Sequence, residues 1–133
     1  MYISKKKVMK RKMLSLGVMI LFYLYEGVRH FLYPHSYFDI IPPYIPMHST
    51  INYMAGTAEI LFALLLIFPQ TRKIAATGII VMLVVYIPTH IYMLELHPET
   101  WQLWVRLFVG QPLLILWAWW HREDRENKKG ILE

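Results

Sequence analysis

Four stretches of the chain are apolar over the length that a membrane-spanning helix requires. They run over residues 13–33, 49–69, 74–94 and 101–120. A bilayer core takes ~20 helical residues, and lipid offers backbone groups no outside partner, so we expect each stretch to be a helix. The alternating ~10-residue segments of a membrane barrel are absent from the sequence. The pattern predicts an all-α integral membrane four-helix bundle that forms a single domain over 1–133.

The positive charges lie at the ends of the apolar stretches and predict the orientation. Twelve of the 14 Lys and Arg residues lie in the N-terminal tail, in the 70–73 turn or in the charged tail 121–133. The loops 34–48 and 95–100 carry none. Because Lys and Arg favour the cytoplasmic side, we expect both termini to be cytoplasmic and both loops to face outward. The basic start also fits a signal peptide, but aromatic residues stand where a cleavage site is expected, which favours a retained first helix.

The composition agrees with lipid as the main solvent of the chain. Hydrophobic residues make up 56% and charged residues 17% of the sequence, against ~25% charged residues in soluble domains. The net charge of +5 is explained by topology, so we do not expect nucleic acid as a partner. The absence of cysteine excludes thiol–disulfide chemistry and thiolate-bound clusters.

The loop 34–48 is unusual because it is both apolar and rich in proline. Proline disfavours a regular helix, and the apolar side chains disfavour a loop that extends into water. We expect this Pro-rich loop to cover the outer face of the bundle. The alternative is an interfacial connector that only seals the helix ends.

Polar side chains at membrane depth are the candidate functional residues, because a charge at the bilayer centre costs ~2.5–3.5 kcal/mol. At a rise of ~1.5 Å per residue, Glu59 and Gln111 fall near the midplane and the others in the outer half. The sequence therefore predicts a polar chamber that opens outward beneath loop 34–48. Its candidate residues are Glu26, Arg29, His30, Asn52, Glu59, His90, Arg106 and Gln111.

Helical spacing and charge suggest contacts within this chamber. Glu26 shares a helix face with Arg29 at i+3 and with His30 at i+4. Arg106 is a permanent cation, and we expect it to pair with Glu59 or Glu26, directly or through water. Without such a pair, Glu59 is expected to be protonated.

Each candidate residue also has a structural interpretation. Asn52 and Gln111 can join helices as polar contacts, and Glu59 can form an ion pair that fixes the bundle. His30 and His90 are more often hydrogen-bonded residues than ligands, although two histidines on facing helices can hold haem. Nothing else in the sequence favours haem. Zinc-spaced histidines, a glycine-rich phosphate loop and a nucleophile elbow are all absent from the sequence, so no metal site is predicted.

Six short motifs, taken in order, resemble the DoxX family of small bacterial membrane proteins. The resemblance covers about residues 13–120. At position 90 the third-helix motif of the family commonly has Asn, so His90 is a departure that adds a titratable group. The motifs are GVRHF at 27–31 with Pro34, IPPYIP at 41–46, GTAEI at 56–60, RKIAA at 72–76, PTHIYM at 88–93 and RLFVGQ at 106–111.

The resemblance implies a four-helix protein of the bacterial cytoplasmic (inner) membrane with a loose link to redox processes, including thiosulfate:quinone oxidoreduction. We therefore expect an accessory subunit that binds a small amphipathic ligand, a quinone or a lipid, and that is not an enzyme as an isolated chain. One alternative is a quinone-linked oxidoreductase subunit, and another is a structural assembly subunit of a larger membrane complex. The expected partners are the lipid bilayer and either a membrane partner subunit or further copies of this chain. No cofactor is evident from the sequence.

Overall fold

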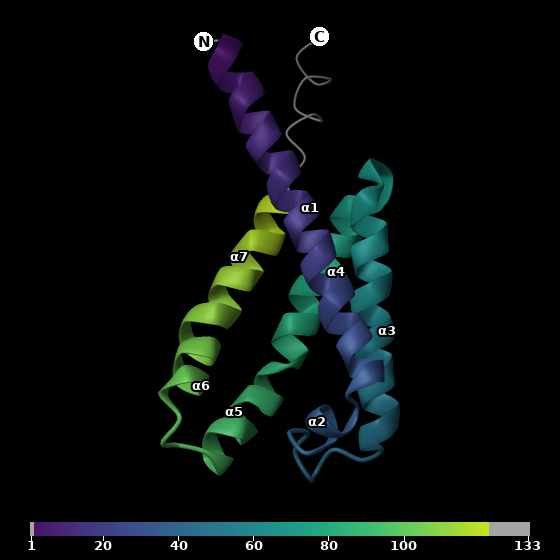
Figure 1. Cartoon of the computed structure of the whole chain (residues 1–133), viewed down its shortest axis with the longest axis vertical. Helices are drawn as coiled ribbons and strands as arrows, with labels where there is room; N and C mark the ends of the chain where they lie inside the picture. Colours follow the sequence, from purple (N-terminus) through teal and green to yellow (C-terminus); the bar gives the residue numbers. More distant parts are fainter. Residues whose placement is uncertain (1, 123–133) are drawn as a thin grey trace.

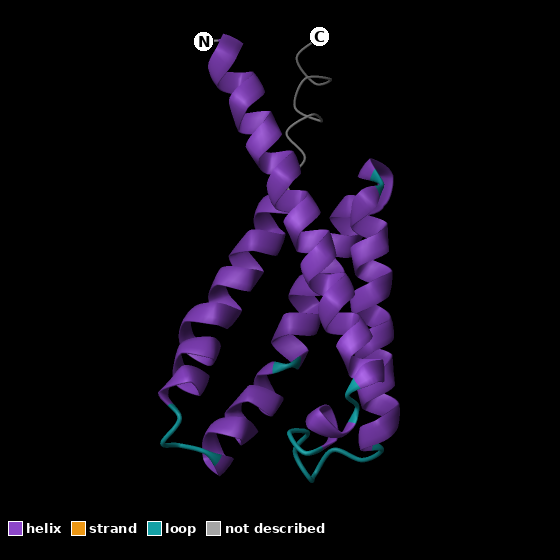
Figure 2. Ribbon diagram, viewed as in Figure 1, coloured by secondary structure: helices purple, strands orange, loops and turns teal. Residues whose placement is uncertain are grey.

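The computed structural model describes residues 2–122, and all regular structure in that range is helical (Figure 1, Figure 2). The all-α prediction is therefore confirmed. Three helical segments of the described chain are long and apolar enough to cross a membrane, namely His48–Ile67, Pro69–Leu96 and Trp101–Arg122. Most of the predicted charged tail 121–133 lies outside the described residues.

The first helix, α1 (Tyr2–Leu32), begins well before the predicted start at residue 13. The basic residues of the N-terminal tail are helical too, because Lys and Arg have high helix propensity and continue the turns set by the apolar residues. Figure 1 shows this part of α1 extending beyond the other helices. The apolar part of α1 packs against α3 (His48–Ile67).

The contact between α1 and α3 is made by two facing stripes of buried residues. In each stripe the buried positions recur every three or four residues, the spacing that places side chains on one face of a helix. The stripes are Leu16, Met19, Tyr23, Gly27 and His30 on α1, and Asn52, Gly56, Glu59, Ala63 and Leu66 on α3.

The two helices come together most closely where Gly27 faces Gly56. A Cβ atom on Gly27 would fall 2.9 Å from the Gly56 carbonyl oxygen, and one on Gly56 would fall 2.6 Å from His30 Cβ. Both positions are too tight for a side chain, so the glycine pair allows the close approach. This approach brings His30 of α1 beside Asn52 and Glu59 of α3.

The third apolar stretch, predicted as one helix over 74–94, is divided into α4 (Pro69–Val85) and α5 (Ile87–Leu96). Pro88 explains the division, because it lacks an N–H and its ring would clash with the carbonyl four residues earlier. Tyr86 lies at the break between the two helices.

The last apolar stretch, predicted as one regular helix over 101–120, contains a π-helical turn. Pro112 explains this turn, because a wider turn removes the clash that a proline makes inside an α-helix. The Gln111 N–H bonds to the Arg106 carbonyl, so these two residues lie one above the other. The elements are α6 (Trp101–Val105), η1 (Arg106–Gly110) and α7 (Gln111–Arg122).

The helices diverge along the molecule (Figure 1). At the closed end, α1 meets α7, where Trp117 Nε1–H donates to Ser15 Oγ at 2.8 Å and Ser15 Oγ lies 3.0 Å from His121 Nε2. At the opposite, cavity end, α1 and α7 lie apart, and α5, α6 and the loop with α2 (His35–Phe38) are found there. The apolar core consists of Leu16, Met19, Tyr23, Ala63, Leu66, Ala75, Ala76, Ile79, Met82, Leu83 and Ala118.

Candidate functional site

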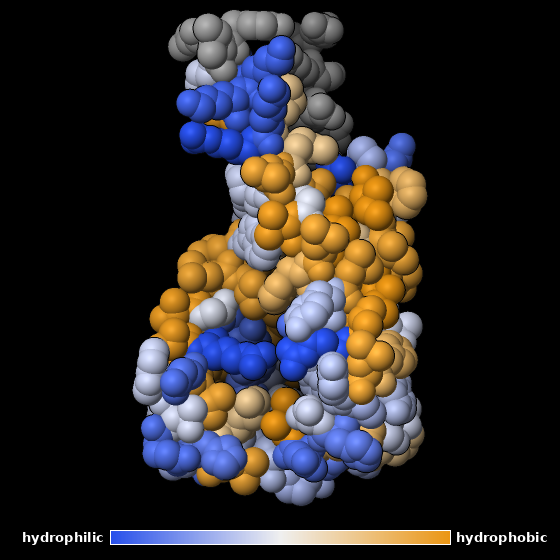
Figure 3. All heavy atoms as spheres, in the orientation of Figure 1, coloured by the Kyte–Doolittle hydropathy of each residue, from blue (hydrophilic) through white to orange (hydrophobic). Residues whose placement is uncertain are grey.

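A cavity of about 660 Å³ is formed at the cavity end by residues of α1, α3, α5, η1 and the intervening segments. Its volume lies within the ~300–1,000 Å³ of small-molecule sites. Figure 3 shows a hollow bordered by hydrophilic side chains on one face of this end, next to hydrophobic surface. All eight sequence candidates lie on the cavity wall, namely Glu26, Arg29, His30, Asn52, Glu59, His90, Arg106 and Gln111.

Glu59 is the most deeply buried charged group of the cavity wall, with a relative exposure of 4%. Its Oε1 accepts a hydrogen bond from the Tyr86 hydroxyl at 3.0 Å. Its Oε2 is buried and has no hydrogen-bond partner among the described residues. His30 Nε2 lies 3.7 Å from Oε2, beyond hydrogen-bond distance.

His30 is held in one orientation by Asn52. The Asn52 amide donates from Nδ2 to the His30 carbonyl oxygen at 2.8 Å, and its Oδ1 lies 2.6 Å from His30 Nδ1. An amide oxygen only accepts, so His30 Nδ1 carries the hydrogen and donates it to Asn52. The ring also stacks on Tyr37, with 3.8 Å between the ring centroids. In the neutral imidazole, Nε2 is therefore a hydrogen-bond acceptor that faces Glu59.

Tyr23 is a cavity residue that the sequence analysis did not single out. Its hydroxyl is buried and has no hydrogen-bond partner among the described residues. Tyr23 lines the same cavity as Glu59 and Glu26. Its place in the stripe with Met19 and His30 was readable from the spacing along α1, but an aromatic residue on an apolar face is normally assigned to packing.

Within residues 2–122, Arg106 does not make a direct ion pair with Glu59 or Glu26, the first of the two forms that the sequence predicted. Among the described residues, Glu26 pairs instead with Arg29, at 3.6 Å, as their i,i+3 spacing suggested. Arg106 lies on the cavity wall but is exposed, because it belongs to the first part of the π-helical turn. The direct pair was expected because Glu59 and Glu26 are the carboxylates within the apolar stretches, but an exposed guanidinium does not need a buried partner.

The remaining two polar candidates bond mainly to backbone. Gln111 is buried and donates from Nε2 to the Leu83 carbonyl at 3.2 Å, which ties α7 to α4. His90 Nδ1 lies 2.9 Å from the Tyr86 carbonyl one turn earlier, so Nδ1 carries the hydrogen. No group of three His, Asp or Glu side chains in residues 2–122 is placed to hold a metal ion.

The loop 34–48 forms part of the cavity wall. Tyr37, Ile40, Ile41 and Ile45 line the cavity, and Ile41 is buried. The loop contains one short helix, α2, where the proline content suggested none, and the rest consists of turns. Burial, with a contribution from the Glu26 charge, raises the pKa of Tyr37, so its phenol stays neutral at physiological pH. The loop thus covers one end of the cavity.

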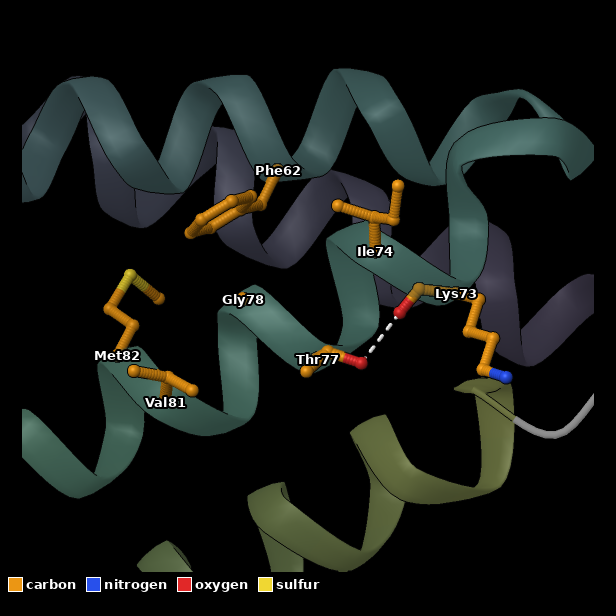
Figure 4. A pocket seen from close by; sticks show the side chains of 7 residues that line it. All are labelled: Phe62, Lys73, Ile74, Thr77, Gly78, Val81 and Met82. Atoms are coloured by element: carbon orange, nitrogen blue, oxygen red, sulfur yellow. Dashed lines mark hydrogen bonds between the residues drawn. The ribbon is translucent and has the colours of Figure 1, made fainter.

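A second hollow, of about 590 Å³, lies along α4 beside α3 (Figure 4). The Phe62 ring lies against Gly78, where a Cβ atom would fall 2.5 Å from the ring. The Thr77 hydroxyl already donates to the Lys73 carbonyl at 2.8 Å and accepts from Arg122 Nε at 2.9 Å. This hollow is an apolar groove, and it lacks the buried, partnerless polar groups of the main cavity.

Residues 19–122 match the family described as a domain of unknown function (DUF8561). The chain belongs to this family. No curated protein matches the sequence, and no solved structure does. The matched range contains every polar residue of the cavity wall, but the family description assigns no activity to them.

Proposed function

We propose that this protein is a DoxX-like integral membrane protein that binds a small amphipathic molecule in the cavity. The observation that carries the proposal is the pair of buried atoms without hydrogen-bond partners, Glu59 Oε2 and the Tyr23 hydroxyl. Such a buried group costs ~1–3 kcal/mol. Two of them on one cavity wall are typical of a site whose polar partner comes from outside the chain.

The lining of the cavity favours a ligand with a polar head and an apolar body. The polar groups gather around Glu59 and His30, whereas Ile40, Ile41 and Ile45 supply apolar wall from the loop. A quinone and the headgroup region of a lipid share this chemistry. The link to redox processes comes only from the DoxX resemblance, and it does not imply that this chain carries out a reaction itself. We therefore propose a ligand-binding accessory subunit for membrane redox processes.

We further propose that α1 is a fourth membrane span and that both chain ends are cytoplasmic, in the inner membrane of a bacterium. Support comes from the charges: the N-terminal tail, Arg72 and Arg122 all lie toward the closed end, while the cavity lies toward the other. The sequence contains no cysteine, so single cysteines can be introduced without background. An impermeant maleimide added to intact cells should label Tyr44→Cys and Glu99→Cys but not Lys7→Cys. The reverse pattern would contradict the orientation.

Ligand binding is tested by calorimetric titration of the purified full chain in detergent. One arm uses decylubiquinone, in both its oxidised and its reduced form, and the other a short-chain phosphatidylethanolamine. Ala55 lines the cavity, so Ala55→Phe should fill it and weaken binding about tenfold or more. Met54, the adjacent residue on α3, is 65% exposed, and Met54→Phe is the matched control.

Saturable binding in one arm identifies the source of the ligand. Binding must also be weakened by Ala55→Phe and unchanged by Met54→Phe. Equal binding to the native chain and to Ala55→Phe, or no saturable binding in either arm, would overturn the proposed function.

A further inference from the structure

The hydrogen-bonding groups around Glu59 specify the kind of polar head that fits the cavity. His30 Nδ1–H is used by Asn52, which leaves Nε2 of the neutral ring as an acceptor. Glu59 Oε1 is used by Tyr86, which leaves Oε2 of the carboxylate as a second acceptor. With the imidazole neutral and Glu59 ionised, these two acceptors face each other across 3.7 Å, and neither carries a hydrogen for the other.

We propose that a ligand hydroxyl in the cavity donates its hydrogen to the acceptor pair His30 Nε2 and Glu59 Oε2, whose residues both line the cavity. The inference rests on the proposed function of the cavity and narrows its ligand class to amphipathic molecules with an O–H donor, such as phenols or quinols. A carbonyl or ether oxygen accepts only, and it would place a third acceptor beside the other two.

Tyr23 supplies the complementary interaction. Its hydroxyl lies on the same cavity wall and has no partner among the described residues. A tyrosine hydroxyl can donate to a ligand oxygen while that oxygen donates its own hydrogen elsewhere. A ligand hydroxyl can therefore give a hydrogen-bond partner to both Glu59 Oε2 and the Tyr23 hydroxyl. A ligand oxygen without a hydrogen can give one only to Tyr23.

The neighbouring charges do not supply the missing hydrogen. Glu26 is paired with Arg29 at 3.6 Å, and Arg106, although on the cavity wall, makes no ion pair among the described residues. The Tyr86 hydroxyl already donates to Glu59 Oε1. A donor to Oε2 must therefore come from a molecule in the cavity or from a proton held by the pair itself.

The test compares two isomers, 4-hexylphenol and 4-pentylanisole, of which only the phenol has an O–H donor. Both are titrated into the native chain in detergent, with empty micelles as the partition blank. We expect the phenol to bind roughly tenfold more tightly or better, a difference of ~1.4 kcal/mol. The ratio of the two affinities should approach one in Glu59→Gln, because the new amide N–H can donate to His30 Nε2 in place of the ligand. Glu95 is an exposed carboxylate, so the ratio should be unchanged in the control Glu95→Gln.

The outcomes separate this inference from the proposed function. Equal binding of phenol and ether to the native chain, weakened by Ala55→Phe, would overturn the inference and leave the cavity as a binding site. No binding of either probe above the Ala55→Phe level would count against both. The ratio measured on the native chain decides the matter alone, so the test holds even if Glu59→Gln does not fold.

Discussion

The closed end and the cavity end both bury a histidine, but only the cavity end leaves buried side-chain polar atoms without partners among the described residues. At the closed end, Ser15 Oγ accepts from Trp117 and bonds to His121 Nε2. At the cavity end, Glu59 Oε2 and the Tyr23 hydroxyl are left without partners among the described residues. Burial of polar groups is thus compatible with simple packing, and it is their incomplete hydrogen bonding that distinguishes a candidate site.

The two ends also differ in the regularity of their helices. Apart from the turn at Phe68 between α3 and α4, the closed end is built from regular helix, with small residues such as Ala63, Ala75 and Ala118 fully buried. At the cavity end the chain departs from the α-helix at Tyr86 and again in the π-helical turn. Regular helices pack side by side along their length. The two irregular segments, which Pro88 and Pro112 explain, therefore favour the separation of the helices around the cavity.

The largest expected effect on stability comes from placing a large side chain where α1 and α3 approach most closely. Gly56→Leu should lower the free energy of unfolding by roughly 3 kcal/mol, because its Cβ would fall 2.6 Å from His30 Cβ. Circular dichroism during thermal unfolding in detergent measures the effect. Gly17→Ala is the control, since nothing lies within 4 Å of its added Cβ, and it should be neutral or stabilising by up to ~1 kcal/mol. An unchanged unfolding midpoint for Gly56→Leu would refute the close approach of α1 and α3.

A smaller effect is expected at the satisfied hydrogen bonds of the closed end. Ser15→Ala removes the partner of both Trp117 and His121, and leaving buried polar atoms unpaired should cost about 1–3 kcal/mol. The same unfolding measurement applies. Ser49→Ala changes an exposed serine and should stay within ~0.5 kcal/mol of the native chain. If the two variants unfold alike, the closed end does not depend on this cluster.

The polar residues of the cavity could be chosen from the sequence, because the position of a residue along its apolar stretch indicates its depth in the bilayer. A polar or charged side chain at that depth is costly, which marks it as a candidate functional residue. Glu59 and Asn52 are seven residues apart within an apolar stretch, a spacing that returns to nearly the same helix face, and both line the cavity. Their contacts could not be read in the same way. The partner of His30 depends on how closely α1 approaches α3, which is determined by two glycines on different helices.

The errors share a physical cause, because each concerns how a side chain lies relative to other helices. Arg106 was expected to pair with Glu59 or Glu26 because of their charges, but it is exposed on the cavity wall and makes no direct ion pair with either among the described residues. His121 was assigned to a charged tail, although it is 1% exposed and bonded to Ser15. Tyr23 was not singled out, because an aromatic ring on an apolar helix face indicates packing, although its hydroxyl is buried without a partner among the described residues. In each case the deciding feature is a contact between helices, which periodicity within one helix does not contain.

The smallest effect on stability, and the sharpest contrast between the two kinds of polar group, is expected from Tyr23→Phe. Its hydroxyl has no partner to lose, so the free energy of unfolding should change by less than ~0.5 kcal/mol or rise slightly. Tyr86→Phe is the matched variant: it removes a hydrogen bond to the Glu59 carboxylate and should cost about 1–3 kcal/mol. Thermal unfolding of both proteins without added ligand separates the two cases. A Tyr23→Phe protein as destabilised as Tyr86→Phe would mean that the Tyr23 hydroxyl is satisfied within the fold. The contrast between the ends of the molecule would then rest on Glu59 alone.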